Sequence, residues 1–545
     1  MNLKAKTLLK DKWILLVLAV QALLLTVFFV KFHFFSAMFE SDAAAEVLLA
    51  ENVLKEGHFL FSNNWIYGLE IRVFHNQIFI EIGYLLFHSF RLAYAFSEVA
   101  FMLILGASGY YLLRSLNVSK FNSSLGVLLL WLPYGGYRRY SVFSMFLGNN
   151  YYSAHVVLEL LFLGTWFQLK KNTLTKKTRN ILTAVECLLA LLMGMCSVRQ
   201  LLLVFLPLAA WEVGSLIARK KDDIVSAGDM WKFIKTSILE LSMMFVCVIS
   251  SLVGYVINSK VLMPRFHTLA ASELSYANLD DMIPQSQRMT SGILKFTGFD
   301  VEHGNVMSLM GVENLFFLIY TIVLVCMLVF IIKKKVACRE YTIFLAVQIA
   351  INLAILLILD IDDVAGMWRY TWLGMYGLLL LPSILLNDKK VPTIYKLVTV
   401  VMVVGMFLTT NFNLFTTSIN RNNRLVRSYS DGIVYNENRN ATAEEREGYI
   451  NYLRSNGYTY GIATFWNGNI TSVLSEGDVR VSAVNNDSEW TFFGVLQPYD
   501  YSDRNAYVPQ FIILSNFEVD ARSAAGLEIP EKVLYQDAKF TVFAY

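Results

Sequence analysis

The chain has 545 residues, of which 56% are apolar and only 16% are charged, and its mean hydropathy is +0.48. A chain of this length is too apolar for a soluble protein and is predicted to be a polytopic membrane protein. The net charge of +3 gives no reason to expect a nucleic-acid partner, and the five cysteines show no CxxC spacing that would indicate a zinc site.

The chain opens with a basic segment and then an apolar stretch. Lys4, Lys6, Lys10 and Lys12 precede residues 13–32, so the positive-inside rule predicts a cytoplasmic N-terminus. No cleavage site of small residues follows this stretch, and we therefore expect a retained membrane helix rather than a signal peptide.

About 20 mainly apolar residues are needed to cross a membrane. Eleven stretches approach this requirement, at residues 13–32, 92–113, 121–135, 153–169, 181–197, 200–217, 236–257, 312–332, 341–359, 367–386 and 396–411. With these spans the Lys- and Arg-rich loops fall on the cytoplasmic side, at residues 114–120, 170–179, 218–221, 333–335 and 388–390.

Residues 78–90 form a further apolar segment. Counting it as a span would move every later lysine cluster to the outside, and it is short for a crossing. We therefore predict a re-entrant or interfacial helix here.

An odd number of spans places most of the non-membrane chain outside the cell. The outer segments are residues 33–91, 136–152 and 258–311, together with everything after the last span. Two domains are expected: a membrane domain over residues 1–411 and an extracytoplasmic α/β domain over residues 412–545.

The C-terminal segment alternates short apolar runs with polar turns. Strands are predicted at residues 460–466, 479–484, 510–515 and 540–545. A helix is expected at "TAEEREGYINYLRSNG", with Thr442 as N-cap and Gly457 just past its end. These elements predict a small α/β domain.

Three acids follow the first span closely, at Glu40, Asp42 and Glu46. One interpretation is that Ser41 or Asp42 caps a short amphipathic helix, since an acid is favourable at a helix N-terminus. The other is that Asp42, at the outer lipid boundary, is a general base for an acceptor hydroxyl. The two roles are compatible.

Several stretches, in order, resemble the GT-C glycosyltransferases that use polyprenyl-phosphate sugars, such as the protein O-mannosyltransferases and the aminoarabinose transferase of lipid A. They are "FESDAAAEVLLAENVLKEGHFL", "FHSFRLAYAFSEVAFMLILGASGYYLLRSL", "NNYYSAHVVLEL", "MGMCSVRQLLLVFLPL" and "MWRYTWLGMYGLLLLP". The resemblance covers most of the chain and implies a GT-C-like polytopic helical fold in a bacterial cell membrane.

In that family the early acid of the first outer loop is the catalytic base. Asp42 has the matching position, and Glu40 is the alternative. The resemblance implies an inverting transfer from a polyprenyl-phosphate donor to a glycan, lipid or protein acceptor. One carboxylate suffices because a phosphate leaving group needs no general acid, unlike the two-carboxylate site of a glycoside hydrolase.

The anionic donor should be met by cations at the outer face. Arg138, Arg139, Arg199 and Arg369 lie at outer loops or span ends, and the last two match positions at which the family often has an arginine. The alternative is that these side chains only reach lipid headgroups.

Other candidate contacts lie at the start of the fourth span. Tyr151 and Tyr152 can stack on sugars, although aromatic residues are common at membrane interfaces. His155 and Glu159 share one helix face and could pair with each other or contact substrate. No clustered carboxylates appear in the later outer loops, so no cofactor is expected and a divalent ion stays open.

The sequence thus predicts a multi-pass glycosyltransferase of the plasma membrane that acts on a lipid-linked sugar at the outer face. A ligase or polymerase of envelope polysaccharides is the alternative enzyme. A transporter or flippase is the alternative from another class, but the expected internal repeats are not visible.

Overall fold

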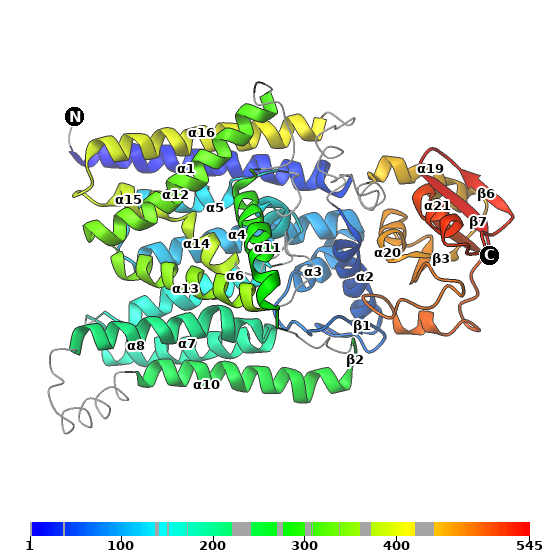
Figure 1. Cartoon of the computed structure of the whole chain (residues 1–545), viewed down its shortest axis with the longest axis horizontal. Helices are drawn as coiled ribbons and strands as arrows, with labels where there is room; N and C mark the ends of the chain where they lie inside the picture. Colours follow the sequence, from blue (N-terminus) through cyan, green and yellow to red (C-terminus); the bar gives the residue numbers. More distant parts are fainter. Residues whose placement is uncertain are drawn as a thin grey trace.

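Most of the chain is described by the computed structural model. It describes residues 3–35, 39–136, 141–149, 152–171, 173–220, 241–269, 276–299, 307, 309–336, 338–359, 372–419 and 441–545. Long helices form a bundle, and a small domain with a β-sheet lies at one end of it (Figure 1). The N-terminus lies at the opposite end of the bundle.

A helix is present at each predicted span. The bundle contains α1 (Leu3–Lys31), α4 (Phe90–Ser115), α5 (Lys120–Trp131), α6 (Ser153–Leu169), α7 (Lys176–Cys196), α8 (Leu206–Lys220), α10 (Ser242–Ile257), α12 (Leu309–Lys334), α13 (Arg339–Ile358), α14 (Trp372–Leu378), α15 (Leu381–Asn387) and α16 (Thr393–Ile419). Among the described residues, eight helices are long and apolar enough to cross a membrane. Helices α5, α6, α14 and α15 fall below that length, so the predicted count of eleven is not confirmed.

Helix α3 (Gln77–Phe87) corresponds to the segment predicted not to cross. Its 11 residues span about 16 Å, roughly half of a bilayer's hydrocarbon thickness. It ends at His88, whose φ of 50° is left-handed and breaks the helix. The apolar tip at Leu85 and Leu86 is exposed, as expected for an interfacial helix.

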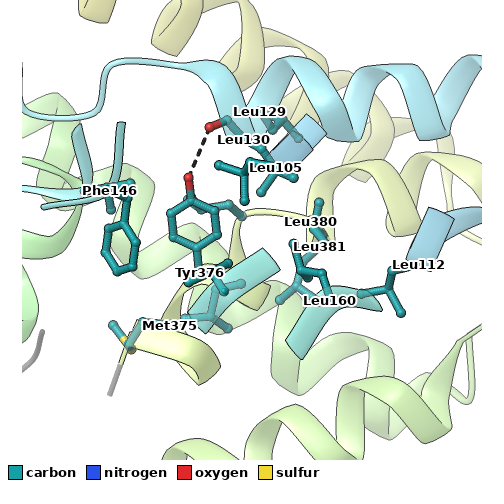
Figure 2. Packing of buried hydrophobic residues seen from close by; sticks show 14 of the residues in the cluster. Leu105, Leu112, Leu129, Leu130, Phe146, Leu160, Met375, Tyr376, Leu380 and Leu381 are labelled. Atoms are coloured by element: carbon teal, nitrogen blue, oxygen red, sulfur yellow. Dashed lines mark hydrogen bonds between the residues drawn. The ribbon is translucent and has the colours of Figure 1, made fainter. Parts of the chain in front are cut away.

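The interior of the bundle is packed with large apolar side chains from several helices (Figure 2). Tyr376 of α14 is fully buried there, and its hydroxyl donates a hydrogen bond to the carbonyl oxygen of Leu130 at 3.2 Å. Leu130 lies in the last turn of α5, where carbonyls have no donor within the helix. The hydrogen bond from Tyr376 therefore gives a partner both to the tyrosine hydroxyl and to a carbonyl at the end of α5, inside the bundle.

Helices α7 and α10 approach each other closely through glycines. A Cβ atom at Gly194 would lie 1.9 Å from the carbonyl oxygen of Ser251, and one at Gly254 would lie 2.1 Å from that of Leu191. Small residues at such crossings allow the backbones to touch, which is how helices associate in lipid.

Two of the segments predicted as outer loops, residues 33–91 and 258–311, contain helices and strands of their own. The first includes α2 (Ser41–Lys55), β1 (Ile66–Tyr67) and α3. The second includes β2 (His267–Thr268), which pairs in parallel with β1, and α11 (Leu279–Leu294). The sequence had not predicted α11, whose Gln285 donates to the last carbonyls of α13.

The C-terminal domain is an α/β fold, as predicted. Its five-stranded sheet has the order β4-β3-β5-β7-β6. The strands are β3 (Tyr460–Thr464), β4 (Arg480–Val484), β5 (Phe511–Ser515), β6 (Val533–Gln536) and β7 (Phe540–Ala544), and the helices are α19 (Ala443–Ser455), α20 (Phe465–Leu474) and α21 (Asn516–Ala524). Strands β3, β4 and β5 are parallel, and β7 is antiparallel to both of its neighbours.

The predicted start and end of α19 are confirmed. Thr442 is the N-cap, and its side chain forms a reciprocal capping box with Glu445. Gly457 follows the helix with a φ of 73°. The four predicted strands are present within one residue or two of their expected ends, but β6 was missed.

Candidate functional site

Helix α2 places the acids of the first outer loop between the bundle and the C-terminal domain (Figure 1). The helix begins at Ser41, and Glu40 is its N-cap residue without a side-chain capping bond. The expectation that Ser41 or Asp42 caps the helix is therefore wrong. The Ser41 hydroxyl donates instead to the carbonyl oxygen of Phe465, in the C-terminal domain.

Asp42 lies in the first turn of α2 and is partly exposed. Its carboxylate is close to the positive end of the helix dipole, which favours the ionised form. The helix itself is more deeply buried than the predicted amphipathic helix, because Ala43, Ala44 and Ala45 are all at most 2% exposed.

Glu46 lies one turn further along α2, on the same face as Asp42. It belongs to a chain of three polar side chains. The Glu46 Oε2 atom lies 3.1 Å from His75 Nδ1, and His75 Nε2 lies 2.9 Å from Arg72 Nη1. His75 and Arg72 come from the segment between β1 and α3.

The direction of these hydrogen bonds follows from the donors available. A guanidinium can only donate, so His75 Nε2 accepts and Nδ1 donates its proton to Glu46. Burial alone would raise the pKa of Glu46, but the hydrogen bond from His75 and the charge of Arg72 hold this pKa below its ordinary value. Glu46 is therefore a carboxylate at neutral pH, and it fixes the tautomer of His75.

Arg199 directly follows the short turn at residues 197–198, which separates α7 from the helical segment that continues into α8. Its Nε atom is 3.8 Å from Glu70 Oε1, and its side chain is 35% exposed. Ser197 organises this turn, because its hydroxyl donates to Glu70 at 2.7 Å and accepts from the Arg199 amide at 3.1 Å. The turn is thus tied to the first outer loop.

His155 lies at the start of α6, and its Nδ1 atom accepts a hydrogen bond from Gln200 at 2.9 Å. Arg199 pairs with Glu70, which is two residues before Arg72 in the first outer loop. The segment that carries Arg199 is thereby joined to the segment that carries Arg72, although the two arginines are 127 positions apart in the sequence. Guanidinium groups are suited to bind phosphate oxygens.

Glu159 lies deeper in the bundle and is only 3% exposed. It accepts a hydrogen bond from Gln348 of α13 at 2.5 Å. Each of His155 and Glu159 is thus bonded to a glutamine from another helix, at Gln200 and Gln348. Gln348 thus gives the buried Glu159 carboxylate a hydrogen-bond partner inside the bundle.

The remaining predicted residues are only partly accounted for. Tyr152 is the N-cap residue of α6, and its ring centroid lies 6.4 Å from that of His155. Four other predicted residues, Arg138, Arg139, Tyr151 and Arg369, lie outside the described part of the chain.

Glu70, Arg72 and His75 were not predicted as site residues. They lie in "EIRVFHN" (70–76), which lacks the periodicity that would have drawn attention to it. A basic residue and a histidine in the same outer loop as the candidate base were the available signal. In the described ranges, no group of three or more His, Cys, Asp or Glu side chains is arranged to hold a metal ion.

No protein-family model and no curated protein matches this sequence. Among solved structures, the chain is similar to ArnT from Cupriavidus metallidurans, both in the apo state and bound to undecaprenyl phosphate. The identities are 12% and 13%, the TM-score is 0.55 in each comparison, and 98% of each chain is covered. An oligosaccharyltransferase from Archaeoglobus fulgidus is more distant, with 10% identity, a TM-score of 0.46, and 92% and 69% of the two chains covered. The likeness to ArnT shows that this chain has the GT-C fold.

Proposed function

We propose that the protein is an inverting glycosyltransferase that moves a sugar from a polyprenyl-phosphate donor to a hydroxyl acceptor at the outer face of the membrane. The observation that carries the proposal is the grouping of an acid and two arginines at one end of the bundle. Asp42 lies one turn from Glu46, which is linked through His75 to Arg72, and Arg199 pairs with Glu70, two residues before Arg72.

The proposed reaction assigns one role to each kind of group. The Asp42 carboxylate takes the proton of the acceptor hydroxyl, and the oxygen of that hydroxyl attacks the anomeric carbon of the donor. The bond from that carbon to the phosphate oxygen breaks, and polyprenyl phosphate leaves with the electron pair. Glu40, two residues earlier at the N-cap position, is the alternative base.

Arg72 and Arg199 stabilise the negative charge that grows on the leaving phosphate. A guanidinium binds phosphate oxygens through a planar pair of N–H groups, and fixed cations are most effective where charge develops. Arg138, Arg139 and Arg369 are proposed as further contacts to the donor, and Tyr151, Tyr152 and His155 as contacts to the sugar or acceptor. No metal ion or cofactor is required by this scheme.

The identity of the donor lipid is supported by likeness rather than by contacts in this chain. The ArnT of similar fold has been solved with undecaprenyl phosphate, and we propose that this protein uses the same type of lipid in a bacterial cell membrane. The N-terminus is then cytoplasmic and the C-terminal domain extracytoplasmic, with a glycan, lipid or protein of the envelope as acceptor.

The test compares envelope glycans by mass spectrometry in cells with the protein, without it, and with Asp42→Asn. The proposal predicts that one sugar substituent is absent from both altered strains. Binding of undecaprenyl phosphate to the purified protein is measured in parallel by native mass spectrometry, and Asp42→Asn should bind it normally. Identical glycans in all three strains would contradict the proposal. A preference for undecaprenyl pyrophosphate would instead favour a polysaccharide ligase or polymerase.

A further inference from the structure

The C-terminal domain and the first outer loop share one hydrophobic core. Ile470 and Val473 of α20 are at most 2% exposed and belong to the same buried cluster as Val47 and Val53 of α2. Helices α2 and α20 pack directly against each other. The domain is therefore not a separate module on a linker, because its own apolar residues complete the core around α2.

Polar contacts from the same domain hold both ends of α2. At the start, the Ser41 hydroxyl donates to the carbonyl oxygen of Phe465. Ten residues later, Arg480 donates through both terminal nitrogens to the two carboxylate oxygens of Glu51, each at 2.6 Å. Ten helical residues extend about 15 Å, so these contacts fix the direction of the helix axis as well as its position.

The pair of Glu51 and Arg480 is largely enclosed, with the Arg480 side chain 25% exposed. Glu51 is 6% exposed, and it also binds Lys55 at 2.9 Å. Burial alone would raise the pKa of Glu51, but Arg480 and Lys55 hold this pKa below its ordinary value. A buried bidentate pair restricts geometry more tightly than a surface ion pair.

A third contact ties the domain to the bundle. The Glu476 carboxylate accepts from the amide of Phe90 at 2.7 Å and from the hydroxyl of Ser89 at 3.0 Å, at the N-terminus of α4. Glu476 has a φ of 49°, a conformation that costs energy for a residue other than glycine. The backbone is thus held in a strained form at the point where the domain meets a membrane helix.

From these contacts we infer that the C-terminal domain is a positioning element of the reaction centre, with Arg480 as its main positioning residue. The domain holds α2, and with it Asp42 and Glu46, in register with the bundle that carries Arg72 and Arg199. The expected effect on the transfer rate rests on the proposed function, whereas the expected effect on the position of α2 does not. A misplacement of about 1 Å can lower a reaction rate about a hundredfold. Loosening α2 should therefore slow transfer more than it weakens donor binding, which depends on α2 only through Glu46 and its link to Arg72.

The experiment uses the full-length protein in detergent with two variants of the pair. Arg480→Met leaves Glu51 buried without its main partner and could unfold the domain. The double variant Glu51→Leu with Arg480→Met removes both charges, a change that preserves folding in comparable buried pairs. Lys539→Met is the matched control, because Lys539 forms its ion pair with Glu445 at 2.9 Å within the C-terminal domain.

Four quantities are measured on each variant: the melting temperature, amide hydrogen exchange of residues 43–53, affinity for undecaprenyl phosphate, and the rate of the transfer identified by the glycan comparison at saturating lipid. The double variant should melt near the wild-type temperature, exchange its α2 amides at least tenfold faster, lose no more than tenfold in lipid affinity and transfer at least tenfold more slowly. The control should match wild type in all four.

Wild-type exchange of α2 in the double variant would overturn the inference, and so would faster exchange with an unchanged transfer rate. If the glycan comparison reveals no transfer, the proposed function fails, but the exchange data still decide whether the domain holds α2. The two proposals therefore fail through different measurements.

Discussion

Replacing Glu46 with glutamine removes one charge from the chain that leads to Arg72. In the wild type, the Glu46 carboxylate can only accept, and it forces His75 to carry its proton on Nδ1 and to accept from Arg72 on Nε2. A glutamine amide can also donate to His75. The tautomer of His75 with its proton on Nε2 then becomes accessible. Its Nε2–H points at the Arg72 guanidinium, which cannot accept a hydrogen bond.

The size of the effect follows from the two hydrogen bonds. A hydrogen bond to a charged group contributes about 1.5–3 kcal/mol, and one between neutral groups about 0.5–1.5 kcal/mol. The Glu46→Gln variant thus loses about 1–1.5 kcal/mol of the free energy that orients Arg72, which corresponds to roughly a five- to tenfold change in an equilibrium constant. We expect the affinity for undecaprenyl phosphate to fall by that factor.

The affinity is measured by native mass spectrometry or by lipid-dependent thermal stabilisation at neutral pH. Glu56→Gln is the matched control, because Glu56 lies in the same loop but accepts from Ser62 and from the backbone of Asn63 and Asn64. The control should lose stability but keep donor affinity. Unchanged affinity in Glu46→Gln, or an equal loss in both variants, would refute the reasoning.

The same carboxylate also makes a pH-dependent contribution to folding. Because the pKa of Glu46 is lower in the folded protein than its ordinary value of 4.5, its stabilisation is fully present above about pH 4.5 and is lost as the pH falls through the folded pKa. The melting temperature of the Glu46→Gln variant should therefore fall less steeply below pH 4.5 than that of the wild type.

Three further predictions follow from the site, the packing and the topology. Arg199→Lys keeps the charge but loses the planar fork, so donor affinity should fall several-fold while the melting temperature stays within a few degrees of wild type; equal affinity would remove Arg199 from the donor site. Gly254→Ala places a methyl group where the backbone of α7 lies, 2.1 Å from a carbonyl oxygen, and should lower stability by about 1–3 kcal/mol in thermal or denaturant unfolding; wild-type stability would mean that α7 and α10 do not pack closely. In a cysteine-free background, a cysteine at Val508, which is 63% exposed, should react with an impermeant reagent in intact cells and one at Lys177 should not; the reverse pattern would invert the proposed topology.

Local sequence signals predicted the C-terminal domain well. The start of α19 was predicted because a threonine before a helical stretch suits an N-cap, and its end because Gly457 suits a left-handed turn. Strand β6 was missed because "VLYQ" is short and only partly buried, so it has neither strict alternation nor a continuous apolar run.

The sequence directed attention to the acids of the first loop but not to the side chains that contact them. Asp42 and Glu46 were noticed because three acids follow the first span closely. Their partners were not visible, since 29 positions separate Glu46 from His75 and 129 separate Glu70 from Arg199. The N-cap of α2 was predicted wrongly for the same reason. The Ser41 hydroxyl donates to the carbonyl oxygen of Phe465, which is 424 positions away.

The most direct test of the account is the transfer activity of Asp42→Asn beside that of Glu40→Gln. Asparagine has the same shape as aspartate, and losing the interaction of the charge with the helix dipole costs about 0.3–1 kcal/mol. We expect the variant to fold and to bind undecaprenyl phosphate normally. Without a carboxylate to take the acceptor's proton, its transfer rate should fall by about 10² to 10⁴, while Glu40→Gln continues to work. The opposite pattern would make Glu40 the base, and near-wild-type rates in both variants would contradict the claim that the acids of α2 perform the chemistry.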